Sequence, residues 1–166
     1  MSHHTPATIG RITSGDAAAL ATFYNSLSPA AIRTFRPLGT STSVEASQHV
    51  VMANATRPEA RFDLLAWRQD RIAGWCFLWD LPTAQPFFGL GIADANRGQG
   101  LGATLLDRVM QEVRKRALPR VYLTVVKDNS IAWRMYQKQG FVRYDEYLDE
   151  ADGETYFRMV WHHRPA

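Results

Sequence analysis

Three glycines stand at alternate positions near the middle of the sequence, in the segment Arg97–Gly102. An amphipathic helix is predicted directly after them, because apolar side chains recur every fourth residue from Leu101 to Val113. Glycines at a helix N-terminus leave unpaired backbone N–H groups open to a ligand, and the helix dipole makes this end positive. Such a segment is suited to bind phosphate oxygens, and Arg97 would add a permanent charge. The alternative is a flexible turn between a strand and a helix.

Two common phosphate-binding motifs do not fit this segment. A Walker loop requires Gly-Lys followed by Ser or Thr, whereas Gly102 is followed by Ala103. A dinucleotide fingerprint has the spacing G-x-G-x-x-G at the first strand–helix turn, whereas the spacing here is G-x-G-x-G and occurs late in the chain. The glycines therefore indicate a phosphate site of another type.

A second group of residues that could do chemistry lies about thirty residues further on. Asn129 and Tyr136 are seven residues apart, so on a helix they fall about 20° short of two full turns and share one face. The small side chain of Ala132 lies between them on that face. The helix would thus present an amide and a phenol to one ligand. The alternative is that Tyr136 only packs the helix against a sheet.

Together these two groups resemble the acetyl-CoA core of the GNAT superfamily of N-acetyltransferases. The resemblance covers residues 87–141 and rests on R-G-Q-G-L-G at Arg97–Gly102, followed by N-S-I-A-W-R-M-Y-Q-K-Q-G-F at Asn129–Phe141. It implies an α/β (α+β) fold: a mixed, largely antiparallel sheet of six to seven strands, with helices on both faces and a V-shaped opening between the fourth and fifth strands. It also implies transfer of an acetyl group to a primary amine of a small molecule or protein by direct attack. A non-catalytic acyl-CoA-binding or sensing module is the alternative.

The resemblance implies a role for each matched residue. Backbone groups of the fourth strand would pair with the pantetheine arm and the acetyl carbonyl of acetyl-CoA, the acetyl-donor cosubstrate, and the glycine segment would hold its pyrophosphate. Asn129 would hydrogen-bond the pantetheine. Tyr136 would be the catalytic acid for the departing thiolate, because a phenol with a pKa of about 10 stays protonated at neutral pH. The expected cofactor-binding residues are Leu90, Gly91, Ile92, Arg97, Gly98, Gln99, Gly100, Leu101, Gly102, Ala103 and Asn129.

The acceptor side of the site is predicted less completely. Many family members place Glu or His on or beside the fourth strand, whereas Phe87–Ile92 contains neither, so no general base is assigned. Asp94 also departs from the family pattern, which often has proline there. Six acids between Asp145 and Glu154 would attract a cationic amine, although a solvated hairpin tip explains them too. The resemblance places substrate-facing loops at Phe35–Ser43 and at the tip of the last hairpin. Trp75 and Trp79 either line the acceptor cleft or belong to the core.

The elements that must position these groups alternate between strands and helices. A residue with capping chemistry precedes several expected helices: Ser28 stands before Pro29, and Thr42 with Glu45 resembles a capping box. Helices are expected at 16–26, 28–36, 42–56, 100–116 and 130–139. Strands are expected at 7–13, 61–68, 72–79, 87–92, 121–126, 141–148 and 155–161.

Composition restricts the class of protein. The 166 residues are 46% hydrophobic, which indicates one globular domain (1–166, core 7–161) and excludes a disordered chain. The single cysteine, Cys76, permits no internal disulfide and suits a reducing cytoplasm, and no metal site is expected. Neither a signal peptide nor a membrane span is evident, and a net charge of +3 is too small for a dedicated nucleic-acid binder. The expected partners are an amine acceptor and, since dimers are common in the family, a second copy of the chain.

Overall fold

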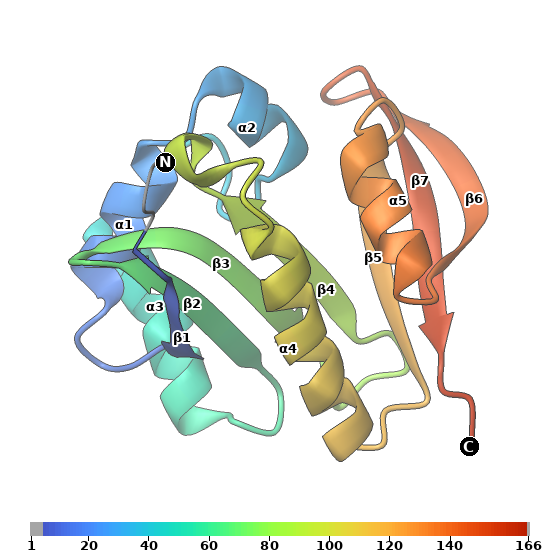
Figure 1. The fold of residues 1–166 in the computed structure, drawn as a ribbon, viewed down its shortest axis with the longest axis horizontal. Helices are drawn as coiled ribbons and strands as arrows, with labels where there is room; N and C mark the ends of the chain where they lie inside the picture. Colours follow the sequence, from blue (N-terminus) through green and yellow to red (C-terminus); the bar gives the residue numbers. More distant parts are fainter. Residues whose placement is uncertain (1–4, 166) are drawn as a thin grey trace.

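The computed structural model describes residues 5–165, and its first and last strands lie far apart in one sheet (Figure 1). The elements follow in the order β1 (Thr8–Arg11), α1 (Ala17–Asn25), α2 (Pro29–Thr34), α3 (Val44–Thr56), β2 (Phe62–Arg68), β3 (Arg71–Trp79), β4 (Phe87–Ile92), the 3-10 turn η1 (Asp94–Asn96), α4 (Leu101–Lys115), β5 (Arg120–Val126), α5 (Ser130–Lys138), β6 (Val142–Asp149) and β7 (Glu154–His162). None of the helices within the described residues is both long and apolar enough to span a bilayer.

The seven strands form one sheet in the order β1-β2-β3-β4-β5-β7-β6. Every neighbouring pair is antiparallel except β4 and β5, which are parallel and meet only at Phe87 and Tyr122. Beyond that pair the two strands diverge, as Figure 1 shows between the green-yellow β4 and the orange β5. The predicted mixed sheet and its V-shaped opening are therefore confirmed.

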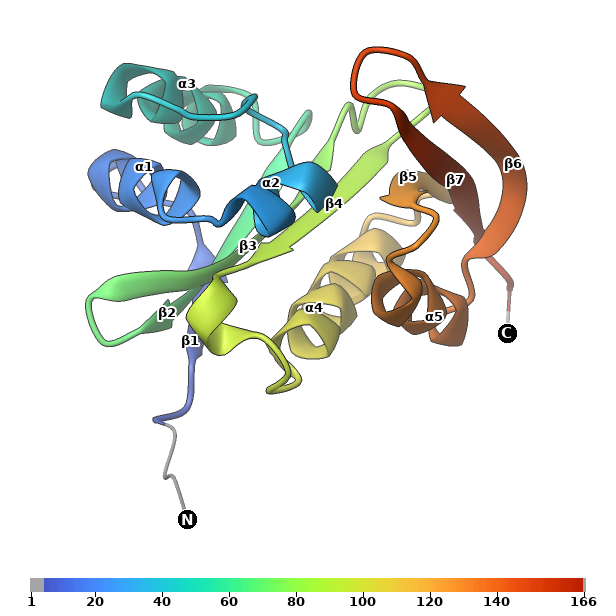
Figure 2. The same ribbon diagram turned by 90° about the horizontal axis from the view of Figure 1, so that it is seen from above.

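Helices cover both faces of the sheet, as predicted. Figure 2 shows α1, α2 and α3 on one face and α4 and α5 on the other. On the α4 face the core contains Leu105, Val109 and Val113, each fully buried, because the apolar stripe of α4 lies against β2, β3 and β4. On the opposite face Tyr24 packs edge-on against Trp75, which is also fully buried. Trp75 is thus a core residue, and the cleft is built from other side chains.

One predicted helix start was wrong by a residue. The α3 helix is capped by Ser43, whose hydroxyl accepts a hydrogen bond from the Ala46 amide at 3.0 Å. Thr42, the expected cap, lies one residue earlier and donates its amide to Asn25 Oδ1 at 2.8 Å. The long-range bond to α1 holds Thr42 outside the helix, which local sequence could not reveal.

The α2 helix begins as predicted. Pro29 occupies its first position, and Ser28 Oγ accepts from the Ala31 amide at 3.2 Å. Elsewhere the observed strand ends differ from the predicted ones by at most one residue. The exception is β1, which ends two residues before the end of the predicted 7–13.

Candidate functional site

A cavity of about 610 Å³ opens where β4 and β5 separate. Its walls come from both halves of the sheet, the N-terminus of α4, one face of α5 and the segment that follows α2. Eleven of the twelve residues predicted for the site line this cavity: Leu90, Gly91, Ile92, Arg97, Gly98, Gly100, Leu101, Gly102, Ala103, Asn129 and Tyr136.

Gln99 is the predicted residue that does not line the cavity. Its side-chain oxygen accepts a hydrogen bond from Arg68 of β2, and its side-chain nitrogen donates to the Ala95 carbonyl at 3.3 Å. The Gln99 side chain therefore connects the glycine segment to β2 and to η1, outside the cavity. Only its backbone amide is left for the predicted ligand contact.

The glycine segment forms an open backbone turn before α4. Gly98 (φ +73°) and Gly100 (φ +79°) have left-handed backbone conformations, which glycine adopts without a steric penalty. A Cβ placed on either would meet no atom within 4 Å among residues 5–165. The backbone conformation, rather than packing, therefore requires glycine, and the space beside the turn is open to a ligand.

The N-terminus of α4 is suited to bind an anion. Its first helical hydrogen bond runs from the Thr104 amide to the Gly100 carbonyl at 3.1 Å, so the amides of the three preceding residues have no helical acceptor. No side chain within the described chain caps this end. Arg97 lines the cavity beside it. These donors and this charge fit a pyrophosphate.

The edge of β4 inside the cavity is unpaired. After Phe87, no residue of β4 has a ladder partner on the β5 side within residues 5–165. An unpaired strand edge offers backbone donors and acceptors to an extended ligand that lies along it. The amide-containing pantetheine arm of an acyl-CoA is such a ligand.

Tyr136 lies deep in the cavity. Only 7% of its surface is exposed, and its ring packs edge-on against Phe88 at 5.7 Å and Phe141 at 6.0 Å between ring centroids. Its hydroxyl makes no hydrogen bond to any residue in the range 5–165. Burial, with a smaller effect from Cys76, raises the pKa of the phenol well above its ordinary value of 10.0. The phenol therefore stays protonated at neutral pH and is suited to donate a proton.

Asn129 directly precedes α5, and its side chain lines the same cavity as Ala132 and Tyr136. Ala132 and Tyr136 lie on the face of α5 that lines the cavity, whereas Asn129 lies outside the helix with a non-helical ψ of 66° and reaches the same cavity from the preceding turn. The Asn129 backbone carbonyl accepts from the Trp133 amide at 3.2 Å, whereas its side-chain amide caps nothing in the part of the chain that the structure describes. The side-chain amide is thus available to a ligand.

Several cavity residues were missed by sequence reasoning. They lie on the α2 side of the sheet and include Phe77, Tyr147 and Tyr156. Phe35 also lines the cavity and begins the segment Phe35–Ser43 that the family resemblance places on the substrate side. A signal for Phe77 and Phe35 was present in β4, where Gly89 and Gly91 alternate in an apolar strand. A Cβ at either glycine would come closer than 3.0 Å to the ring of Phe77 or Phe35. These glycines therefore make room for aromatic rings.

Comparison with known proteins agrees with this geometry. The model of the acetyltransferase (GNAT) family matches residues 22–141. The chain belongs to the GNAT family. Members of this family use acyl-CoA, typically acetyl-CoA, as the acyl donor.

Individual relatives of this GNAT chain are distant. Mycothiol acetyltransferase from Catenulispora acidiphila is 35% identical over 96 residues, which cover 52% of the chain but only 29% of that longer protein. A GNAT acetyltransferase structure from Streptococcus pneumoniae has a TM-score of 0.80 at 23% identity, covering 94% of this chain and 98% of that one. The spermidine N-acetyltransferase from Vibrio cholerae, in complex with CoA and spermine, has a TM-score of 0.78 at 19% identity and covers 95% of both chains. These structural likenesses show the fold alone.

Asp94, the expected departure from the family pattern, lies in η1 just before the glycine segment and ties η1 to the N-terminus of α2. It accepts hydrogen bonds from the Ser28 amide at 3.0 Å and the Ser28 hydroxyl at 2.7 Å. These bonds lower the pKa of Asp94 below its usual value of 3.8. The departure from the family pattern therefore leaves the loop open and adds an anchor between two segments that flank the cavity.

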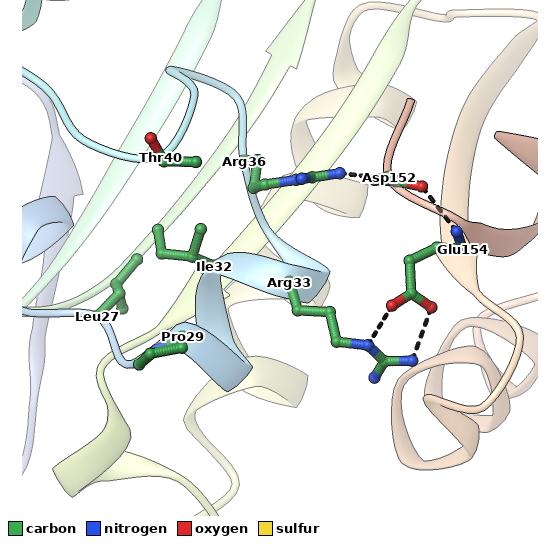
Figure 3. A pocket seen from close by; sticks show the side chains of 8 residues that line it. All are labelled: Leu27, Pro29, Ile32, Arg33, Arg36, Thr40, Asp152 and Glu154. Carbon is green, nitrogen blue, oxygen red and sulfur yellow. Dashed lines mark hydrogen bonds and ion pairs between the residues drawn. The ribbon is translucent and has the colours of Figure 1, made fainter. Parts of the chain in front are cut away.

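The acids at the hairpin tip of this GNAT chain are largely paired. Arg33 of α2 donates to Glu154 at 2.7 Å, and Arg36 binds Asp152 (Figure 3). Arg33 also donates to Asp128, which precedes α5, at 2.6 Å. On the hairpin itself, Asp145 pairs with a neighbouring arginine at 2.6 Å. Both Arg33 and Arg36 line the large cavity and a second cavity of about 420 Å³ behind α2. They join α2 to the β6–β7 hairpin at the mouth of the site.

Proposed function

We propose that this GNAT protein is an acetyl-CoA-dependent N-acetyltransferase whose acceptor is a primary amine. One observation carries the proposal: a single cavity contains the anion-suited N-terminus of α4, the unpaired edge of β4 and the protonated phenol of Tyr136. The first two features suit the two ends of an acyl-CoA tail. The phenol would donate the proton that a leaving thiolate needs.

Bound acetyl-CoA would supply an acetyl group activated as a thioester. The residues of the chain would bind and orient it: Arg97 and the α4 amides at the pyrophosphate, and the edge of β4 along the pantetheine. The amide of Asn129 would hydrogen-bond the same arm from the opposite wall. Because these groups are held by regular elements, the thioester would be positioned before the acceptor arrives.

The acceptor must reach the site as a neutral amine. An ammonium of pKa about 10.4 is deprotonated roughly once in a few thousand molecules at pH 7, and water takes this first proton. The amine nitrogen then forms a bond to the acetyl carbon while the carbon–sulfur bond breaks. Tyr136 donates its proton to the departing sulfur, and the second proton lost by the nitrogen restores the phenol. The products are an acetamide, CoA thiol and one released proton.

A second function has one observation in its favour. β4 has glycine at positions 89 and 91, and Phe87–Ile92 contains no Glu or His that could act as a base. A non-catalytic module that binds or senses acyl-CoA would need no base.

Two lesser parts of the proposal concern the partner and the location. We propose a second copy of the chain as a partner, and a reducing cytoplasmic location, which suits the single buried cysteine, Cys76.

The two functions are separated by measuring CoA thiol release from acetyl-CoA with a panel of amines, together with acetyl-CoA binding by calorimetry. An N-acetyltransferase releases thiol in proportion to acetylated amine. Binding of acetyl-CoA without thiol release for any amine would favour the sensing module. No binding at all would overturn both.

A further inference from the structure

The mouth of the cavity carries an excess of negative charge. Asp149 lines the large cavity, Asp152 and Glu154 line the second cavity beside it, and Asp128 contacts Arg33. Two arginines, Arg33 and Arg36, line both cavities. Both arginines are engaged: Arg33 contacts Asp128 and Glu154, and Arg36 contacts Asp152. A cationic ligand would therefore be attracted here.

Asp149 differs from the other carboxylates at the mouth. It is half-buried and lines the large cavity, yet no cation within residues 5–165 pairs with it. Its Oδ1 accepts from the Ala151 amide at 2.9 Å, which fixes the carboxylate at the end of β6. The opposite oxygen, Oδ2, makes no hydrogen bond within that same range. Asp149 thus offers one oriented carboxylate oxygen to a ligand.

The strand register places Asp149 at the hairpin end of the cavity. Val126, the last residue of β5, pairs with Tyr156, and Tyr156 pairs with Tyr147. Asp149 lies two residues beyond Tyr147 on β6, about 7 Å further along the strand, where it pairs with Glu154 next to the turn. Asp149 and Tyr136 thus belong to different elements of the cavity wall, the end of β6 and the helix α5, and Tyr136 is only 7% exposed.

Aromatic rings line the cavity that these two residues share. Tyr147 and Tyr156 stack on one wall, with ring centroids 5.4 Å apart and planes 17° apart. Phe35, Phe77 and Phe87 line the opposite wall. Such walls bury methylene groups and also tolerate a passing cation. They suit an extended apolar spacer.

From these placements we infer that Asp149 binds a second positive charge on the acceptor, separated by an apolar spacer from the amine that is acetylated. This inference rests on the proposed N-acetyltransferase function and names its substrate class: elongated primary amines with one distal cationic group. A third positive charge on the acceptor should add little to its binding, because Asp128, Asp152 and Glu154 already contact Arg33 or Arg36.

The test compares 1,5-diaminopentane with 1-aminopentane, which has the same spacer but no second charge. For the wild-type protein we expect kcat/KM for the diamine to exceed that for the monoamine by about tenfold, beyond the factor of two for its second amine. In Asp149→Asn this preference falls to about the statistical factor, while the KM for acetyl-CoA is unchanged. The matched control is Glu150→Gln, which removes an exposed charge one residue away and outside the cavity. It keeps the preference.

Two results would overturn the role of Asp149. One is a diamine-to-monoamine ratio of kcat/KM that is the same in wild type and Asp149→Asn. The other is a fall of this ratio in Glu150→Gln as large as in Asp149→Asn. Spermidine outperforming the diamine by tenfold would contradict a single distal charge. Thermal unfolding and acetyl-CoA affinity matching wild type show that Asp149→Asn is folded. If the wild type acetylates no amine, the proposed function itself fails; if it acetylates amines without the charge preference, only this inference fails.

Discussion

The ring of Phe35 lies over Gly91 of β4 so closely that a Cβ at residue 91 would fall less than 3.0 Å from it. Phe35 ends α2, and its ring also packs edge-on against the buried Trp75 at 5.6 Å between centroids. The segment after α2 therefore packs directly against β4, because Gly91 has no side chain that would separate them. This contact makes the side of β4 that faces α2 apolar.

Replacing Gly91 with alanine should destabilise the fold. The new methyl group would push against the Phe35 ring, and overpacking of this kind costs about 1–3 kcal/mol of unfolding free energy. Urea unfolding measures the change. Gly10→Ala in β1 is the control, because a Cβ there meets no atom within 4 Å among residues 5–165, and we expect a change within about 0.5 kcal/mol. Similar losses in both variants would show that the ring contact is unimportant.

Replacing Gly100 with alanine should weaken acetyl-CoA binding. The left-handed backbone costs an alanine about 1 kcal/mol of stability, and the methyl group would enter the space left for the phosphates. Gly153→Ala is a matched control, since Gly153 has φ +73° and open surroundings in the described chain but lies in the β6–β7 turn. Both variants should lose similar stability. Only Gly100→Ala should lose affinity, by tenfold or more in calorimetry, and unchanged affinity would reject the phosphate site.

The parts of the site that were predicted correctly depend on local signals. The turn at Gly98 and Gly100, the start of α4 and the cavity position shared by Asn129 and Tyr136 all follow from spacing within one segment. The resemblance to the GNAT family then joined the two segments and supplied the mixed sheet with its opening between the fourth and fifth strands. Spacing alone gives no such long-range pairing.

The acceptor wall could not be predicted in this way. The resemblance placed the segment that begins at Phe35 on the substrate side, but Phe77 and Tyr147 are separated by tens of residues and meet it only through tertiary packing. The six acids near the β6–β7 turn were recognised in the sequence. Their spacing did not show that Arg33 would pair with Glu154 and Arg36 with Asp152. For the same reason, Asp149 could not be distinguished from its five acidic neighbours.

Cys76 should be unreactive in the native protein. It is fully buried, and burial, with a smaller contribution from the charge of Asp63, raises the pKa of its thiol well above the ordinary value of 9.0. At pH 8, Ellman's reagent should therefore modify the folded protein only slowly. One thiol per chain should react once guanidinium unfolds it. Rapid reaction of the native protein with one equivalent would contradict this burial.

The anchor between Asp94 and Ser28 should make stability depend on pH. A carboxyl whose pKa is lowered by folding stabilises the folded state above its unfolded pKa of about 3.9, and this contribution is lost as the pH falls through the lower folded value. Asp94→Asn should therefore unfold at a lower urea concentration than wild type at pH 7. At about pH 2 the difference should vanish.

The control for this anchor is Asp70→Asn, in the exposed turn between β2 and β3. It should match wild type at both pH values. An Asp94→Asn defect of equal size at pH 7 and pH 2 would show that the charge of Asp94 is not involved.

The role of Tyr136 is tested most directly by replacing it with phenylalanine, which keeps the packing against Phe88 and removes the phenolic proton. With acetyl-CoA and the best amine acceptor, kcat should fall by about 100-fold or more, while the Kd of acetyl-CoA stays within about twofold. Tyr144→Phe, at an exposed position of β6 outside the cavity, should leave both values unchanged. A Tyr136→Phe variant that turns over as fast as wild type would contradict proton donation by this residue to the departing sulfur.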